Sequence, residues 1–478
     1  MTLPADFDRL DLAPEDARAL GYRFIDMVIE RWRTLPDEPL NRTASRAEME
    51  ALLREPVPEE PADLDAMLHL LRDEVLPRQV SVNHPRFFAF VPTPSNLVSI
   101  FAEALIAGYN PFMGTWKVAP ACAQIEIITL DWLASMCGLC PGAAGGIFTS
   151  GGSMANLIAL AAARHVKLGD DMTGAVLYAS DQVHSAVPRA LRIMGFRPKQ
   201  LRVLACDDEQ RLDPRMVEQA IRADRAAGLR PFCIIANAGS TNTGAVDPLP
   251  ELADLCSSED LWLHVDGAYG AAAMLTEEGR AALAGLDRAD SIALDPHKWL
   301  FQPYETGVVL VRERRHLLET FAITADYMRD VIGPDEEEVN FRDYGPQLTR
   351  SFRALKVWLS IELFGLAAFR GAIQRGMDLA RHAQAILESR PRQWQVVTPA
   401  NLAIITFRHL PPDHEQSDAA IDAHNQRLID LIFADETAMI SSTLVAGRPV
   451  LRLCTINPRT TELDLERTIG RFEELADE

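Results

Sequence analysis

Five short apolar runs, each bounded by Gly, Pro, Asn or Asp, constrain the fold of this chain more than any other feature. They are Ala175–Ala179, Phe232–Ala236, Leu261–Val265, Ser291–Leu294 and Val308–Val311. Runs that are apolar throughout predict strands buried on both faces, and the helical segments between several of them predict a mainly parallel sheet covered by helices. Sheets of this kind bind ligands beyond the carboxyl ends of their strands. We therefore expect an α/β fold with its site at that edge.

The chain of 478 residues is longer than one hydrophobic core usually spans, so we expect several units. We divide it into an N-terminal helical arm (1–84), a large domain (85–365) and a small C-terminal α/β domain (366–478). The arm is too short to bury its apolar face alone, and we expect it to pack on the main body or on a partner subunit. Residues 312–350 are acidic and lack apolar periodicity, which predicts a lid or a disordered segment.

Composition excludes several classes of function. The net charge of −21, from 68 acidic and 47 basic residues, argues against nucleic-acid or anionic membrane partners and is typical of a soluble surface. No apolar run is long enough to cross a bilayer, and the N-terminus lacks a signal-peptide pattern, so we expect a cytoplasmic protein. Seven scattered cysteines predict no disulfide framework. Cys137 and Cys140 could form a redox pair or half a zinc site, but no second pair accompanies them, and we expect a structural role and no metal.

The most informative motif is SIALDPHKW, which places Lys298 directly after a buried strand. A lysine at a strand end is ordinarily solvated, but this one has apolar neighbours on both sides. Burial lowers the pKa of a lysine, and a neutral amine is what imine formation with an aldehyde requires. We therefore expect Lys298 to bind a carbonyl cofactor.

A second strand, in LWLHVDGAY, ends at Asp266. A buried carboxylate needs a cationic partner, and a protonated pyridine nitrogen would serve and would keep the ring an electron sink. A helix N-cap is the alternative interpretation of this residue alone.

Three further groups follow strands or begin helices. The motif TSGGSMAN, residues 149–156, combines glycines and hydroxyls at a helix start, which is typical of an anion site although ordinary capping has the same pattern. Thr241 offers a further hydroxyl, and His184 an aromatic plane suited to stacking on a flat ring. Each has an ordinary structural explanation, but together they predict one site.

The chain resembles the group II pyridoxal-phosphate decarboxylases of the aromatic-L-amino-acid type. The resemblance extends from about His84 to Trp358 and is carried, in order, by HPRFFAFVPT, PACAQIEIITLDWL, DQVHSAV, WLHVDGAY, ADSIALDPHKW and SFRALKVW. It implies a fold-type-I homodimer with a mainly parallel seven-stranded sheet and an active site shared between subunits.

The resemblance also implies roles for individual residues. Lys298 would carry pyridoxal 5'-phosphate covalently, Asp266 would pair with its ring nitrogen and His184 would stack on the ring. Thr93 would lie close to the substrate carboxylate or to the lysine. The full set implied for the cofactor is Gly152, Ser153, His184, Thr241, Asp266, Ala268, Asp295, His297 and Lys298.

Several positions depart from the family pattern. Asp295 stands where animal relatives have Asn, and because a carboxylate repels phosphate we expect it to turn away or to contact another group. Met154 replaces a common Glu. Val82, Val91 and Gly114 replace bulky aromatic residues that line the substrate pocket, which suggests extra room there. Thr349 occupies a position where plant relatives tune substrate preference.

The expected reaction is decarboxylation of an L-amino acid, most simply an aromatic one such as Tyr, Dopa, Trp or Phe, to an amine and carbon dioxide. Tyr327, in an expected mobile loop at about 323–345, would return a proton to Cα with help from His184. An aldehyde synthase is the nearest alternative activity. In the family that the chain resembles, this activity accompanies loss of the loop tyrosine or of the stacking histidine, and both residues are present here. The remaining alternatives are a decarboxylase of a non-aromatic amino acid, a transaminase and a cofactor-binding scaffold without catalytic activity.

Overall fold

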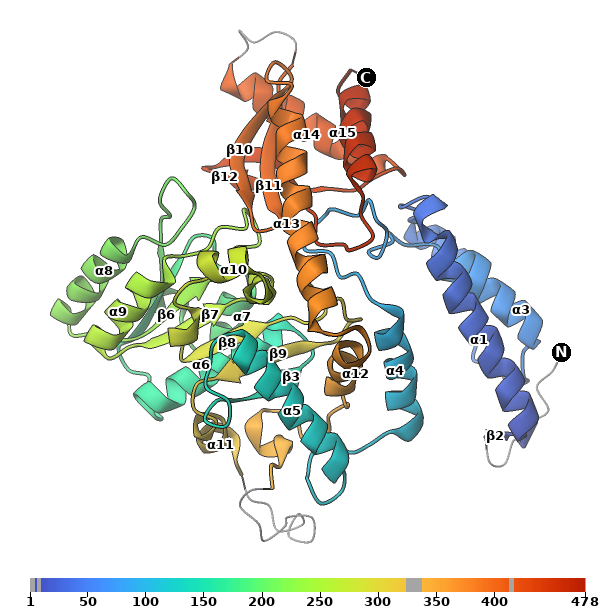
Figure 1. Ribbon diagram of the computed structural model, residues 1–478, viewed down its shortest axis with the longest axis horizontal. Helices are drawn as coiled ribbons and strands as arrows, with labels where there is room; N and C mark the ends of the chain where they lie inside the picture. The colour runs from blue at the N-terminus through green and yellow to red at the C-terminus, as the bar shows by residue number, and fades with distance from the viewer. Residues whose placement is uncertain (1–4, 7–9, 324–337, 412–416, 478) are drawn as a thin grey trace.

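Seven strands form the large sheet at the centre of the molecule (Figure 1). The computed structural model describes residues 5–6, 10–323, 338–411 and 417–477. The strands are β3 (Gly145–Thr149), β4 (Ala175–Ser180), β5 (Leu201–Leu204), β6 (Arg230–Asn237), β7 (Trp262–Asp266), β8 (Ser291–Leu294) and β9 (Gly307–Val311). Their spatial order is β3-β9-β8-β7-β6-β4-β5, and β9 alone runs antiparallel to its neighbours.

The five apolar runs correspond to β4, β6, β7, β8 and β9, which confirms the expected mainly parallel α/β class. The sequence did not single out β3 and β5. Strand β3 begins with two glycines, which disfavour strands. Strand β5 lies at the sheet edge and is only partly buried, so it needs no continuous apolar run.

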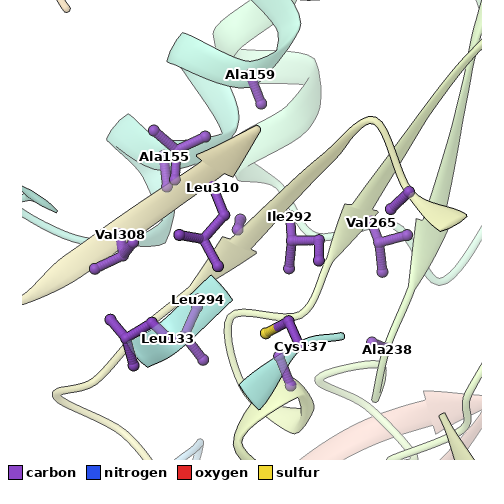
Figure 2. Packing of buried hydrophobic residues seen from close by; sticks show 14 of the residues in the cluster. Leu133, Cys137, Ala155, Ala159, Ala238, Val265, Ile292, Leu294, Val308 and Leu310 are labelled. Carbon is purple, nitrogen blue, oxygen red and sulfur yellow. The ribbon is translucent and has the colours of Figure 1, made fainter. Parts of the chain in front are cut away.

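Helices cover both faces of this sheet. The helices of this part of the chain are α4 (Leu97–Tyr109), α5 (Pro120–Met136), α6 (Gly152–Leu168), α7 (Ala186–Ile193), α8 (Pro214–Ala226), α9 (Leu249–Glu259), α10 (Glu277–Ala282), α11 (Arg315–Phe321) and α12 (Ala354–Phe364). Figure 2 shows Ala155 and Ala159 of α6 on one side of β8 and β9, and Leu133 and Cys137 from the α5 segment on the other. Short 3-10 segments occur at Leu35–Asp37, Pro198–Gln200, Gly270–Leu275, Leu286–Arg288 and Phe341–Tyr344.

A second, antiparallel sheet follows toward the C-terminus in the order β10-β11-β13-β12. Its strands are β10 (Trp394–Asn401), β11 (Ile404–His409), β12 (Ser441–Val445) and β13 (Arg448–Cys454), and it packs with α13 (Leu366–Glu388), α14 (Asp418–Ala434) and α15 (Glu462–Asp477) around its own apolar core. Tyr269 links the two sheets. Its hydroxyl accepts the backbone N–H of Ala403 at 2.8 Å, and its ring stacks on Trp299 with 5.1 Å between centroids.

The N-terminal arm stands beside the rest of the chain (Figure 1). It contains β1 (Ala5–Asp6), β2 (Asp11–Leu12), α1 (Pro14–Thr34), α2 (Arg46–Leu53), α3 (Leu64–His69) and a π-helical turn (Leu70–Val75). No residue of α1 is buried, and Tyr22, Phe24 and Ile29 are 61%, 44% and 45% exposed. The helical arm predicted from the sequence is thus present, with an apolar face that the described part of this chain leaves uncovered.

The described parts of the acidic segment 312–350 are more ordered than we expected. Residues 315–321 form α11, with Leu317 fully buried, and the 3-10 segment Phe341–Tyr344 packs into the main core. Residues 324–337, which include Tyr327, lie outside the described residues.

The Cys137 thiol is buried in the main core, which raises its pKa to about 12, whereas Cys140 is exposed. Within the described residues, no three His, Cys, Asp or Glu side chains form a metal site. None of the described helices is by itself both long and apolar enough to cross a membrane. The bent pair α12–α13, at 96°, passes that test of length and composition only when its two helices are joined.

Candidate active site

Parallel strands end together at one edge of the large sheet. Strand β4 leads to His184, β7 ends at Asp266, and β8 leads into Asp295 and Lys298. The charges of Asp266, Lys298 and Asp295 all act on the pKa of the His184 imidazole, so these side chains lie near one another. The structure thus brings together the residues that the sequence placed at strand ends.

The Asp266 carboxylate is buried, with 8% of the residue exposed. Its Oδ1 accepts the backbone N–H of Ala268 at 3.1 Å, and its Oδ2 accepts Nδ2–H of Asn156 at 3.1 Å. Both oxygens therefore have donors that fix the plane of the carboxylate.

Lys298 forms an ion pair with Asp295, with 3.0 Å between Nζ and Oδ2. Burial alone would lower the pKa of Lys298, as we expected, but the charges of Asp295 and Asp266 outweigh burial and raise this pKa above its ordinary value. The expectation of a neutral lysine in the protein alone is therefore wrong. It considered only the apolar neighbours in sequence and not the two carboxylates that folding brings near.

Asp295 contacts the lysine, which is one of the two outcomes expected for it. Its Oδ2 also lies 3.6 Å from Nε2 of His297, while its buried Oδ1 has no hydrogen-bond partner among the described residues. His297 is anchored through Nδ1, 2.8 Å from the carbonyl oxygen of Thr306, and burial lowers the pKa of its imidazole.

Helix α6 begins at the predicted anion site. No side chain caps this helix, and Gly151 at its N-cap has φ of +158°. A Cβ added to Gly152 would lie 2.8 Å from Oδ2 of Asp295 and 3.2 Å from Cβ of Ala268, so the backbone approaches the other site residues closely. Uncapped N–H groups at a helix start suit a phosphate. Ser153 is exposed beside them.

His184 is exposed, and partial desolvation lowers the pKa of its imidazole. Its Nδ1 accepts the backbone N–H of Ala186 at 3.2 Å, so the neutral ring carries its hydrogen on Nε2. Thr241 is half-buried in the loop after β6. Tyr327 lies outside the described residues, so its predicted role stays a prediction.

Four of the residues predicted to contact substrate occupy different environments. Thr93 is buried, and its hydroxyl has no partner among the described residues. Val82 packs on a small apolar cluster that joins the N-terminal segment to Met439, Val91 packs on the main core, and Thr349 is exposed.

Gly114 does not leave the extra room that we expected. A Cβ built on it would lie 2.5 Å from Cζ of Phe112 and 3.0 Å from the carbonyl oxygen of Leu348. The Phe112 ring therefore fills the space that a larger residue at 114 would need. An aromatic side chain is retained there, but it comes from a neighbouring position.

Residues 47–410 match the family model described as the pyridoxal-dependent decarboxylase conserved domain. The chain belongs to this family. It is 45% identical over 471 residues to an aromatic-L-amino-acid decarboxylase of Bacillus atrophaeus, with 98% of both chains covered. It is also similar to a phenylacetaldehyde synthase of Arabidopsis thaliana, at 30% identity over 94% of this chain and 93% of the relative. The solved structure of Oryza sativa TDC with PLP and tryptamine superposes with a TM-score of 0.93 at 28% identity, covering 98% of each chain.

This pyridoxal-dependent decarboxylase has a site that fits its cofactor. The uncapped start of α6 offers N–H donors to a phosphate, Lys298 offers an amine to an aldehyde, and Asp266 offers an acceptor to a ring nitrogen. The unpartnered Oδ1 of Asp295 marks a polar position that the protein alone leaves unsatisfied. The protein is a pyridoxal-phosphate-dependent amino-acid decarboxylase.

Sequence reasoning missed two residues of this decarboxylase site, Asn156 and His264. Asn156 was part of the TSGGSMAN motif but received no role, although it lies one helical turn after Gly152. His264 precedes Asp266 by two residues, and the period of a strand places both on one face. These spacings were the signals that could have identified them.

Proposed function

We propose that this decarboxylase converts an aromatic L-amino acid into the corresponding amine and carbon dioxide. The observation that carries the proposal is the 45% identity, over 98% of both chains, to a relative whose name specifies aromatic amino acids. The structural similarity to a TDC solved with tryptamine supports the same substrate class. The Phe112 ring beside Gly114 retains an aromatic side chain near a position predicted to contact substrate.

Bound pyridoxal phosphate supplies an electron-accepting ring that stabilises the negative charge left at Cα when carbon dioxide departs. We assign Asp266 to the position opposite the ring nitrogen, because both of its oxygens already have donors that hold the carboxylate in place. Lys298 holds the cofactor, and Gly152 and Ser153 hold its phosphate. His184 covers the ring, with its hydrogen kept on Nε2. Tyr327 with His184 returns a proton to Cα.

A panel of amino acids tests the substrate class. Purified holoenzyme is incubated with L-Trp, L-Tyr, L-Dopa and L-Phe, and with L-Glu and L-2,4-diaminobutyrate as non-aromatic controls. We expect carbon dioxide release and an amine of matching mass with at least one aromatic substrate, and no turnover by Lys298→Ala. Turnover confined to the non-aromatic controls would overturn the proposed substrate class while leaving the decarboxylase assignment intact.

The same reaction mixtures separate the rival activities. An aldehyde synthase would consume oxygen and release an aldehyde, ammonia and peroxide along with carbon dioxide, whereas a decarboxylase releases only the amine and carbon dioxide. A transaminase would need a keto-acid acceptor and release no carbon dioxide. Peroxide released in the same molar amount as carbon dioxide would show that the chain has the aldehyde synthase activity and not the proposed one.

We propose that two copies of the chain form a homodimer that covers the arm. The supporting observation is the apolar face of α1, which a 21-residue helix exposes without one buried residue. An exposed apolar surface of this kind is typical of an interface. The same assembly would let the neighbouring subunit contribute to the site.

Light scattering after size exclusion tests the assembly. We expect twice the mass of one chain, and we expect Ile25→Glu or Ile29→Glu to shift the protein toward monomer. Met216→Glu on the exposed surface of α8 serves as the control, because it makes the same charge change at an exposed apolar side chain away from the arm. A monomeric wild type would refute the proposal.

A further inference from the structure

A continuous chain of buried hydrogen bonds leads away from Asp266 into the sheet. Asn156 Nδ2 lies 3.1 Å from Oδ2 of Asp266, and Asn156 Oδ1 lies 2.7 Å from Nε2 of His264. Nδ1 of His264 lies 2.9 Å from Oγ of Ser291, which in turn lies 2.8 Å from Nε1 of Trp262. None of the four residues behind Asp266 is more than 1% exposed, so water does not compete for these bonds.

The direction of every bond in this chain is determined. Asn156 uses its amide group to donate to Asp266 and to Gly152, so its Oδ1 faces His264 Nε2 and can only accept. In the neutral ring Nδ1 of His264 then accepts from Ser291 Oγ, which itself accepts the indole N–H of Trp262. His264 then carries its hydrogen on Nε2 and donates to Asn156 Oδ1. Burial lowers the pKa of His264, which agrees with a neutral ring. All donors therefore point toward Asp266.

The opposite arrangement is excluded by the second bond of Asn156. Its Nδ2 also donates to the carbonyl oxygen of Gly152 at 2.8 Å. A flipped amide would place its oxygen against that carbonyl and against Asp266 at once, which puts three acceptors together. The amide thus has one stable orientation, and it joins the first turn of α6 to the end of β7.

We propose that Asn156, oriented by His264, is a positioning residue that holds Asp266 against the cofactor's ring nitrogen and keeps that nitrogen protonated. The proposal rests on the position of Asp266 given in the proposed function above. Asn156 contacts Gly152 as well, so it also fixes the distance between the carboxylate and the helix start assigned to the phosphate. One side chain thus contacts both the carboxylate and the helix start that would hold the two ends of the cofactor.

The competing explanation is that the chain only satisfies buried polar groups and stabilises the sheet. That explanation predicts a loss of stability and nothing else when a member is replaced. The positioning role predicts a change in the cofactor itself. A spectroscopic readout of the ring nitrogen therefore separates the two.

The test uses holoenzyme loaded with cofactor labelled with ¹⁵N in the ring, whose chemical shift distinguishes protonated from unprotonated pyridine. We expect Asn156→Leu and His264→Phe to move the shift toward the unprotonated form and to raise the cofactor Kd about tenfold, as the loss of one hydrogen bond to a charged group predicts. His264→Gln keeps a donor near Nε2 and should restore both values.

Asn425→Leu is the matched control. Asn425 is fully buried in the C-terminal part of the chain, and its amide donates to the carbonyl oxygens of His409 and Ile421. It should lower stability without moving the ¹⁵N shift. If Asn156→Leu and His264→Phe behave like this control, the positioning role is refuted.

Asp266→Ala distinguishes failure of the position assigned to Asp266 from failure of the positioning role proposed for Asn156. If it leaves the ring nitrogen protonated, the position assigned to Asp266 is wrong. If it removes the proton while the variants at 156 and 264 do not, the assignment of Asp266 stands and the proposal for Asn156 alone fails. Where Asn156→Leu does not fold, His264→Phe and its rescue by His264→Gln give the same decision.

Discussion

Replacing Arg350 by methionine tests whether a buried ion pair fixes the segment that carries Thr349. The side chains of Arg350 and Glu126 are both 0% exposed. Arg350 donates to both carboxylate oxygens of Glu126 and, at 3.0 Å, to the carbonyl oxygen of Phe148 in β3. The pair thus joins α5, β3 and the segment before α12.

The expected cost follows from what the substitution leaves behind. Glu126 would keep one donor, the backbone N–H of Phe148 at 3.2 Å, and would become an uncompensated buried charge. Breaking such a pair costs about 3–5 kcal/mol, which corresponds to roughly 150-fold to 4,000-fold in an equilibrium constant. Glu126→Gln added to Arg350→Met removes the charge and keeps an acceptor for Phe148, so the double variant should recover half or more of the loss.

Hydrogen exchange of the β3 peptide, read by mass spectrometry, and urea unfolding measure the effect. Arg222→Met is the control, because its pair with Glu218 is exposed and should contribute less than about 1 kcal/mol. A double variant as unstable as Arg350→Met, or a single variant as stable as the control, would refute the reasoning.

Three further predictions concern the cofactor and pH. Gly152→Ala should raise the cofactor Kd about tenfold, because its Cβ would lie 2.8 Å from Asp295 Oδ2 and such overpacking costs about 1–3 kcal/mol. Gly21→Ala is the control and should leave the Kd unchanged, because the space around Gly21 is open. Equal Kd values for the two variants in a cofactor titration would contradict this prediction. Asp295→Asn removes a charge that raises the pKa of Lys298, so visible absorbance of the bound cofactor should develop severalfold faster at neutral pH, and an unchanged rate would speak against the ion pair. Burial lowers the pKa of His84 from 6.5 to about 4, so its contribution to stability is present above pH 6.5 and is lost as pH falls toward 4. Lowering the pH from 7 to 5 should therefore reduce the free energy of unfolding, measured with urea, by about 2 kcal/mol through His84 alone. The free energy of unfolding of His84→Gln should fall by correspondingly less over the same pH range.

The large sheet could be predicted because its central strands are buried on both faces and must be apolar throughout. Strand β5 was not predicted, because a strand at the edge of a sheet is only partly buried and need not be apolar throughout. The residues at strand ends were identifiable for a similar reason, since the parallel topology places the ends of β4, β7 and β8 together.

The predictions about the site that proved wrong concerned contacts between residues that are distant in the sequence. The pKa of Lys298 is set by Asp295 and Asp266, and the sequence around the lysine gives no measure of their distance. The Phe112 ring fills the space beside Gly114 because the backbone turns there, which a comparison of aligned residue types does not show. Thr349 and Tyr327 belong to segments whose role depends on a second subunit in the proposed assembly.

The stack of Tyr269 on Trp299 has a mechanical consequence. Trp299 directly follows the lysine, and Tyr269 follows Asp266 by three residues while its hydroxyl accepts the backbone N–H of Ala403, between β10 and β11 of the antiparallel sheet. A hinge rotation of that sheet would pull on both site segments at once. The stack therefore couples any displacement of the antiparallel sheet to the segments that carry Lys298 and Asp266.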